Sequence, residues 1–227
     1  MFFPRIAFSA LLALMTLAAA PVEARSVSVA VVGDSLANDL ANGMEDNFTG
    51  KPVNVIKLTQ FATGLVRTDY FNWNGTVQNA LRHGDANVVV VVLGGNDHQP
   101  IRVDGRRLDP LTKEWRAEYA RRVGHFMDTI GRSRGKLYWV GLPDVRSDKL
   151  GHGYRAMNAI YKREAAKRKL RYIDIWGKFH AKDSAYSSFG MSLEGVKRQI
   201  RKDDGMHFTE AGRRVFADYV ARSIGLR

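Results

Sequence analysis

Three short polar sequences, far apart along the chain, contain residue types used in nucleophilic catalysis. They are GDSL at residues 33–36, GGND at residues 94–97 and DGMH at residues 204–207. The first carries a serine, whose hydroxyl is a weak nucleophile until a neighbouring base removes its proton. The last carries a histidine, the side chain that most often acts as such a base. We therefore predict acyl transfer through Ser35 and His207, provided that folding brings them together.

A catalytic histidine needs an acidic residue that orients its ring. Asp204 lies three residues before His207, a spacing at which its carboxylate can reach one ring nitrogen while the other faces Ser35. Asp203 is the second choice for this acid. Simpler interpretations stay open, because a serine at a strand-to-helix turn commonly caps the helix. An aspartate and a histidine this close together can also belong to an ordinary surface turn.

Acyl transfer also requires hydrogen-bond donors for the oxyanion that forms in the transition state. Asn96 carries a side-chain amide and follows two glycines, which allow close approach of the backbone. Gly64 can supply a backbone N–H, and the N–H of Ser35 is a third donor. We predict that these three donors form the oxyanion hole. Ordinary turns are the alternative interpretation of Gly64 and of GGND.

The elements that must position these residues follow from the apolar pattern. Apolar runs predict β-strands at residues 28–33, 53–58, 87–93, 137–142 and 170–175. Helical spacing predicts helices around residues 36–44, 115–130 and 157–165, and a last helix capped by Thr209. This alternation indicates a parallel sheet covered on both faces, with binding sites at the carboxyl ends of its strands. Residues 97–112 and 178–203 fit neither pattern, and long loops of this kind are often functional.

Taken in order, GDSL, the glycine at residue 64, GGND and D-x-x-H resemble the SGNH (GDSL-type) hydrolase superfamily over nearly the whole chain after residue 24. The resemblance implies a three-layer α/β/α flavodoxin-like fold with a five-stranded parallel sheet, and neither metal nor organic cofactor. It implies Ser35 as nucleophile, His207 as base and Asp204 as its orienting acid. It also implies Gly64 and Asn96 as oxyanion donors.

Further residues resemble an exported bacterial subgroup of this superfamily that has no known substrate. They lie at residues 67–73, 96–99 and 139–143. In agreement with export, residues 1–24 have the pattern of a signal peptide, with Arg5 before an apolar stretch at 7–20 and small residues before the expected cut. An uncleaved anchor is the alternative, but the stretch is short beside the roughly 20 residues of a membrane span.

We therefore predict a single SGNH hydrolase domain at residues 25–227, located in the periplasm or secreted, with no stable membrane insertion after removal of the signal. The domain contains no cysteine, which excludes thiol nucleophiles and zinc–thiolate sites. Asp203, Asp204 and His207 could ligate a metal ion. The remaining histidines show no paired ligand spacing, so we expect no metal.

The formal net charge of +12 constrains the partners. A basic balance can indicate nucleic acid, an acidic membrane surface or an anionic polymer. Export and the lack of an arginine-rich block argue against nucleic acid, whereas an anionic envelope glycan is a reasonable partner. Plain solubility is the alternative explanation. The G-x-S-x-G elbow of α/β-hydrolases and the G-x-G-x-x-G motif of dinucleotide-binding folds are both missing from the expected positions.

The predicted activity is hydrolysis of O-acyl esters, with acetyl esters of a cell-envelope or extracellular carbohydrate as the expected substrates. Two alternatives remain at this stage. A periplasmic O-acyltransferase would use the same triad, and a glycan-binding module would keep the scaffold without turnover. Five residues near the predicted strand ends are expected to line the substrate pocket: Asp69, Tyr70, Trp73, Asp97 and Gln99.

Overall fold

A computed structural model describes residues 26–179 and 186–226. The predicted signal peptide, residues 1–24, lies outside these ranges. Five parallel strands form the central sheet in the order β2-β1-β3-β6-β7. The strands are β1 (Val27–Gly33), β2 (Val53–Thr59), β3 (Val88–Val92), β6 (Lys136–Val140) and β7 (Arg171–Ile173). The predicted five-stranded parallel sheet is confirmed.

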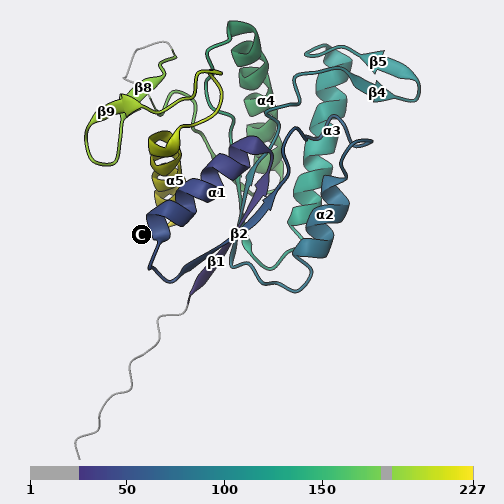
Figure 1. Cartoon of the computed structure of the whole chain (residues 1–227). Coiled ribbons are helices and arrows are strands. Elements are labelled where there is room, and N and C mark those ends of the chain that lie inside the picture. The colour runs from purple at the N-terminus through teal and green to yellow at the C-terminus, as the bar shows by residue number, and fades with distance from the viewer. Residues whose placement is uncertain (1–25, 180–185, 227) are drawn as a thin grey trace, which may run out of the picture.

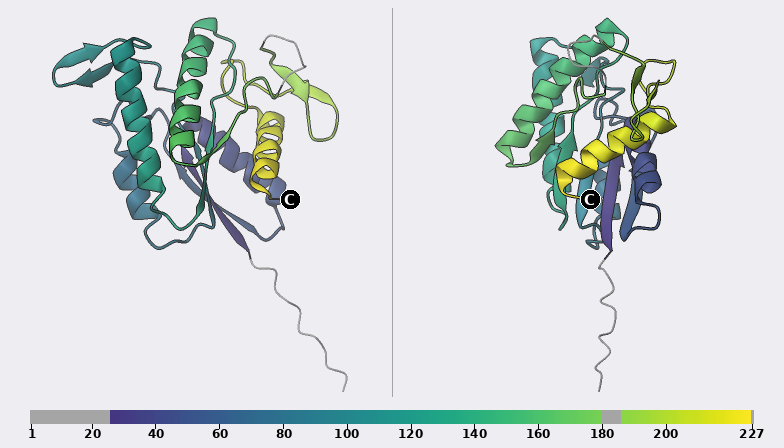
Figure 2. Two further views of the ribbon diagram at one scale, coloured as in Figure 1. Left: turned by 180° about the vertical axis from the view of Figure 1, so that it is seen from behind. Right: turned by 90° about the vertical axis from the view of Figure 1, so that its left-hand side faces the viewer.

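Helices cover both faces of this sheet, as Figures 1 and 2 show. One face carries α1 (Ser35–Phe48) and α5 (Glu210–Ile224), which pack against each other. The other face carries α2 (Trp73–Ala80), α3 (Lys113–Ile130) and α4 (Asp148–Lys167). The chain leaves β1 toward β2 on one side and returns to β3 on the other, so β1 and β3 flank the switch point of the sheet. This arrangement is the predicted three-layer α/β/α fold.

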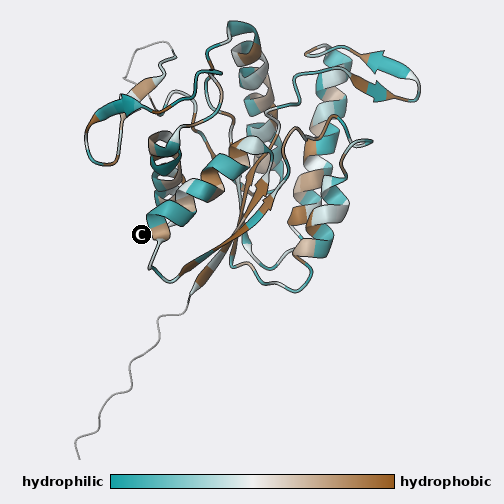
Figure 3. Cartoon of the chain, in the orientation of Figure 1, coloured by the Kyte–Doolittle hydropathy of each residue, from teal (hydrophilic) through white to brown (hydrophobic). Residues whose placement is uncertain are grey.

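The two central strands are apolar because both of their faces are covered. All five valines of β3 are buried, and Val29–Val32 of β1 are fully buried. Burying a valine side chain contributes roughly 1.5–3 kcal/mol, so these strands are a major source of stability. Figure 3 shows the apolar strands at the centre and hydrophilic residues on the outer faces of the helices. Among the described residues, no helix is both long enough and apolar enough to span a bilayer.

The last helix begins where the sequence predicts. The hydroxyl of Thr209 accepts a hydrogen bond from the backbone N–H of Gly212 at 3.2 Å, which satisfies one free donor of the first turn of α5. At its other end, Gly225 adopts φ +82° and closes the helix in the left-handed conformation that glycine favours. The position of α5 matters because DGMH lies immediately before it.

Three elements were not predicted from the sequence. Helix α2 is short and buries only Trp73 and Val77, too few apolar residues for a helical period to be recognised. The two stretches that fitted no pattern each contain a β-hairpin of three-residue strands. These are β4 (Ile101–Val103) with β5 (Arg106–Leu108), and β8 (Phe189–Met191) with β9 (Lys197–Gln199). In Figure 1 both hairpins lie at the end of the molecule to which the carboxyl ends of the strands point.

Candidate active site

Ser35 lies at the sharp turn between β1 and α1. Asp34 is the N-cap of α1, and its Oδ1 accepts the backbone N–H of Leu36 at 3.0 Å. Ser35 is therefore the first helical residue and not the cap. The simpler interpretation of this serine as a helix cap is excluded, because Asp34 already fills that position. The hydroxyl of Ser35, at a residue that is 9% exposed, remains available for another contact.

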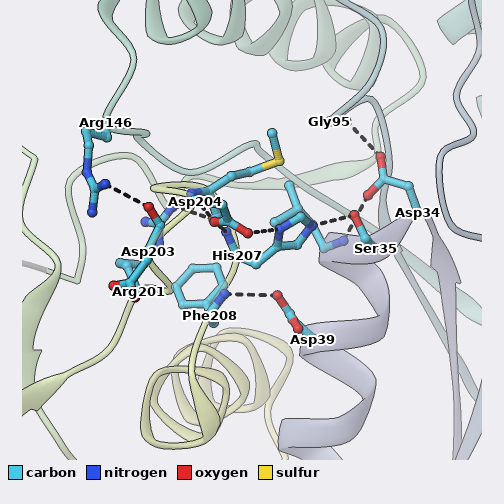
Figure 4. Close-up of polar contacts among 12 residues, drawn as sticks. Asp34, Ser35, Asp39, Gly95, Arg146, Arg201, Asp203, Asp204, His207 and Phe208 are labelled. Carbon is cyan, nitrogen blue, oxygen red and sulfur yellow. Dashed lines mark hydrogen bonds and ion pairs between the residues drawn. The ribbon is translucent and has the colours of Figure 1, made fainter.

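That contact is with His207. Ser35 Oγ and His207 Nε2 are 2.8 Å apart, and His207 Nδ1 lies 2.8 Å from Asp204 Oδ2. Figure 4 shows the three side chains in one line, with the imidazole between the hydroxyl and the carboxylate. With Nδ1–H donated to Asp204, Nε2 carries the lone pair that can accept the hydroxyl proton of Ser35. Residues 172 positions apart in the sequence thus form a hydrogen-bonded triad.

The carboxylate of Asp204 also folds the loop that carries His207. Its Oδ1 accepts the backbone N–H groups of Met206 at 2.8 Å and His207 at 2.9 Å. Between them, Gly205 adopts φ +73°, which a residue with a side chain rarely tolerates. Burial alone would raise the pKa of Asp204, but these donors and the His207 ring lower that pKa to about 2. Asp204 is thus ionised throughout the range in which an esterase works.

Asp203, the second choice for the orienting acid, does not contact the His207 ring. Its Oδ1 accepts from Gln199 Nε2 at 2.9 Å, and its backbone carbonyl accepts from Arg146 Nη1 at 2.7 Å. The structure therefore gives the ring contact to Asp204.

A buried arginine, which was not predicted from the sequence, supports the same loop. Arg201 is 1% exposed, and its Nη2 donates to the carbonyls of Asp144 at 2.8 Å and Met206 at 2.6 Å. Its guanidinium also lies over the ring of Phe208, 4.4 Å from the centroid. These contacts hold the residues on both sides of His207. Arg201 lies in a run of basic residues that resembles a solvated surface, so its burial could not be predicted from the sequence.

The other oxygen of Asp34 joins the serine turn to GGND. Asp34 Oδ2 accepts the backbone N–H groups of Gly94 at 3.0 Å and Gly95 at 2.8 Å. Burial raises the pKa of Asp34 to about 6, even though these donors and the N–H of Leu36 oppose the shift. Gly94 has φ +119°, and a Cβ there would collide with the hydroxyl of Tyr161. At Gly95 the neighbour is the carboxylate itself, because a Cβ there would lie 3.2 Å from Asp34 Oδ2.

Asn96 reaches the same cleft as Ser35 and His207. Its Nδ2 donates one hydrogen bond to the carbonyl of Thr63 at 2.9 Å. An amide nitrogen carries two hydrogens, so this bond orients the group and leaves a second N–H for a ligand. The predicted role of Asn96 as an oxyanion donor is therefore geometrically possible, and it remains a prediction.

Gly64 lies behind the cleft. It is buried, and a Cβ at this position would collide with the carboxylate of Asp97. Phe61 and Ala62 are the residues of this loop that line the cleft, whereas Gly64 is not among them. Its predicted contribution of an N–H to the oxyanion hole remains untested. The need for glycine here follows from its packing against Asp97.

Two predicted pocket residues belong to the interior, so their prediction as substrate contacts is wrong. Asp97 is fully buried, and its oxygens accept the N–H groups of Leu65 and Val66 and the hydroxyl of Tyr119. Trp73 is 2% exposed, and its Nε1 donates to Thr63 Oγ1 at 3.1 Å. Both side chains brace the loop between β2 and α2 and have no free face for a substrate.

The other three predicted pocket residues lie outside the cleft next to Ser35. Asp69 is exposed and accepts two N–H groups from Arg67. Tyr70 is exposed, and Gln99 is half-buried with its amide bound to the carbonyl of Asn96. Their contact with a larger substrate remains a prediction.

The cleft itself has a volume of about 430 Å³ and lies between α1 and the residues at the start of α5. Ser35 and His207 form part of its wall. Seven of its ten other lining residues are polar or charged, and three are apolar: Asn38, Asp39, Asn42, Asn96, Lys202, Glu210 and Arg213, with Phe61, Ala62 and Phe208. A hydroxyl, an imidazole and an amide thus face one open space large enough for a small acyl group and part of its alcohol.

Comparison with known proteins agrees with this architecture. Residues 28–223 match the family described as "Protein of unknown function (DUF459)". No curated protein matches the sequence.

Several solved structures share the fold. An aryl esterase from M. Smegmatis superposes with a TM-score of 0.59 at 18% identity, covering 88% of this chain and 98% of that one. A mutant of Axe2, an acetyl-xylooligosaccharide esterase from Geobacillus Stearmophilus, gives 0.59 at 14% identity, with 89% and 96% covered. LAE5, an alpha/beta hydrolase enzyme from the metagenome of Lake Arreo, gives 0.60 at 12% identity, with 89% and 96% covered. The chain therefore shares the fold of these three enzymes.

Proposed function

Because this chain belongs to the DUF459 family, whose description gives no activity, we propose its function from the site: it is a serine hydrolase of carboxylic esters. The observation that carries this proposal is the 2.8 Å contact between Ser35 Oγ and His207 Nε2, with Asp204 on the opposite ring nitrogen. A glycan-binding module without catalytic activity would not need the side chains of Ser35, His207 and Asp204 to be hydrogen-bonded to one another.

The reaction proceeds in two steps. His207 Nε2 takes the hydroxyl proton of Ser35 as Oγ bonds to the ester carbonyl carbon. The tetrahedral intermediate collapses, the bond to the alcohol oxygen breaks, and the imidazolium gives its proton to that oxygen. Water then loses a proton to Nε2 and attacks the acyl-enzyme. The bond to Oγ breaks, the acid leaves, and the proton returns to Ser35.

The negative charge of each tetrahedral intermediate requires donors at the start of α1. The backbone N–H of Ser35 lies in the first turn of that helix, where free N–H groups favour an anion. The second N–H of Asn96 supplies a side-chain donor, and the N–H of Gly64 is the third donor of the proposal. One such donor contributes about 3–4 kcal/mol to the barrier reduction.

The lining of the cleft supports O-acyl groups, such as acetyl, on a carbohydrate as the substrate. Asn38 and Asn42 offer amides from the same face of α1 as Ser35. Phe61 is 56% exposed at the rim, which suits an aromatic ring that stacks on a sugar face. Axe2, which shares the fold, is an acetyl-xylooligosaccharide esterase. The proposed location is the periplasm or the cell exterior, as the sequence of residues 1–24 suggests.

Hydrolysis of p-nitrophenyl acetate by the wild type, Ser35→Ala and His207→Ala tests this proposal. We expect both variants to lose at least a thousandfold in kcat while keeping the wild-type melting temperature. Equal activity in Ser35→Ala would refute it. Repeating the assay with an oligosaccharide acceptor and analysing the products identifies the alternative: an O-acyltransferase moves the acyl group to the sugar, and a hydrolase releases it as free acid.

A further inference from the structure

The β8–β9 hairpin exposes an unusual amount of apolar surface. Phe189 is 51% exposed, Met191 58%, Leu193 41% and Val196 49%. They are four of the six large apolar residues that are exposed in the described part of the chain. Single exposed apolar residues are common, but clusters of them mark interaction surfaces.

The register of the hairpin places apolar and basic side chains on one face. Met191 pairs with Lys197, and directly opposed residues of an antiparallel pair project to the same side. Phe189, two residues before Met191, shares this face. The residue between them, Gly190, faces the protein, because a Cβ there would collide with the carbonyl of Phe179. The face of the hairpin that carries Phe189, Met191 and Lys197 is thus both apolar and cationic. In Figure 3, β8 has the colour of hydrophobic residues and β9 that of hydrophilic ones.

The charge around these side chains is mostly positive and unpaired. Lys197 forms no ion pair with any carboxylate of the described residues, whereas Glu194, at the turn, pairs with Arg214 at 2.7 Å. Arg198 is opposite Gly190 and therefore projects to the other face of the hairpin. Lys178 lines the groove of about 500 Å³ into which Phe189 and Met191 also project. A cationic rim around exposed apolar side chains is the composition of surfaces that sit in the headgroup region of an anionic membrane.

We propose that this surface, formed by the hairpin residues Phe189, Met191, Leu193, Val196 and Lys197 with the neighbouring Lys178, docks the protein onto an anionic lipid bilayer. The apolar side chains enter the headgroup–acyl boundary, and the cations contact lipid phosphates. A soluble anionic polymer would use the cations but leave the apolar side chains in water. A second copy of this chain would bring together two molecules with a formal charge of +12 each, which opposes association.

Docking through this surface has a consequence for the site. The hairpin continues directly from β9 into Arg201 and the loop of His207, and Gln199 holds both ends of that connection through Arg201 O and Asp203 Oδ1. In Figure 1 the hairpin lies at the same end of the molecule as the start of α1. A bilayer bound there would lie beside the open cleft and bring membrane-proximal esters to Ser35. Membrane binding itself does not depend on the proposed hydrolysis.

The test is co-sedimentation of the chain lacking residues 1–24 with vesicles of phosphatidylglycerol and phosphatidylcholine, compared with pure phosphatidylcholine, at about 0.1 M salt. We expect the wild type to bind the anionic vesicles at least tenfold more tightly than the neutral ones. Two variants, Phe189→Ser with Met191→Ser and Lys178→Glu with Lys197→Glu, should each weaken anionic binding at least tenfold. Both should keep the wild-type melting temperature, because these side chains are exposed.

Matched controls come from elsewhere on the chain. Tyr70→Ser removes another exposed large residue, 62% exposed, and Arg106→Glu with Arg107→Glu makes the same charge change on the β4–β5 hairpin. Both controls should bind as the wild type does. The proposal is overturned if the wild type does not bind anionic vesicles or if neutral vesicles bind equally well. It is also overturned if the controls weaken binding as much as the hairpin variants, or if the hairpin variants only dissociate a dimer in sedimentation velocity. A wild type that binds the anionic vesicles but hydrolyses no ester would refute the proposed function and leave the proposed membrane docking intact.

Discussion

Asp39 Oδ2 accepts the backbone N–H of Phe208 at 3.0 Å, which fixes the residue after His207 to helix α1, one turn beyond Ser35. The bond joins segments 169 residues apart and is buried. This hydrogen bond holds the backbone next to His207 at a set distance from α1. It does so without contacting the reacting atoms of Ser35 and His207. Burial raises the pKa of Asp39, and the Phe208 N–H and nearby cations, Lys202 first, oppose that shift.

Asp39→Ala should therefore lower kcat on a soluble ester about tenfold or more, because His207 loses the anchor that holds it against Ser35. Asp39→Asn retains an acceptor oxygen and should recover most of the activity. Steady-state kinetics of both variants measure the effect. Equal kcat values for the wild type and Asp39→Ala would show that the bond does not position His207.

Asn96→Ala should lower kcat about a hundredfold or more while leaving the melting temperature within a few degrees of the wild type, because it removes a transition-state donor. Asn79→Ala, an exposed amide on α2, is the matched control and should leave kcat unchanged. A decrease of less than threefold in Asn96→Ala would remove this residue from the oxyanion hole.

Arg201→Met should lower kcat at least tenfold with little change in KM, because the loop on both sides of His207 loses its support. Two backbone carbonyls also lose their donor, so the melting temperature should fall by about 4–8 °C. Val77→Ala leaves a cavity in the core at α2 and serves as the control. It should lose a comparable amount of stability and keep the wild-type kcat. If both variants retain the same kcat, Arg201 acts on stability alone.

The buried carboxyl of Asp34 should make stability depend on pH. Its pKa is raised from 3.8 to about 6 in the folded protein, so between these values the folded state binds more protons than the unfolded state. The free energy of unfolding contributed by this group therefore falls as pH rises from about 4 to about 6. The full difference is about 3 kcal/mol at 1.36 kcal/mol per pKa unit.

Denaturant titrations of the wild type and Asp34→Asn at pH 4, 5, 6 and 7 measure this dependence. The stability advantage of the wild type over Asp34→Asn should be larger at pH 4 than at pH 7. A constant difference across this range would show that Asp34 keeps an ordinary pKa.

The strand pattern and the contact between Asp204 and His207 could be predicted because both are local signals. A run of valines predicts a buried strand wherever it occurs, and the spacing of three positions from Asp204 to His207 already limits their relative geometry. The switch point of a parallel sheet then brings the ends of β1 and β3 together, so the neighbourhood of Ser35 and Asn96 follows from topology.

The roles of Asp97, Trp73 and Arg201 could not be predicted, because they depend on partners supplied by distant segments. Asp97 follows a strand end, as a ligand-binding residue would, but the loop after β2 supplies donors that occupy both of its oxygens. Arg201 resembles its solvated neighbours until Phe208 and two carbonyls enclose it. The hairpins escaped detection because strands of three residues are too short to show alternation.

The most direct test of the central claim is mass spectrometry of the protein after incubation with a fluorophosphonate. We predict a single covalent adduct on the peptide that contains Ser35, absent in Ser35→Ala and formed at least a hundredfold more slowly in His207→Ala. A folded wild type that acquires no adduct, or acquires it on another residue, would contradict the assignment of Ser35 as a nucleophile activated by His207.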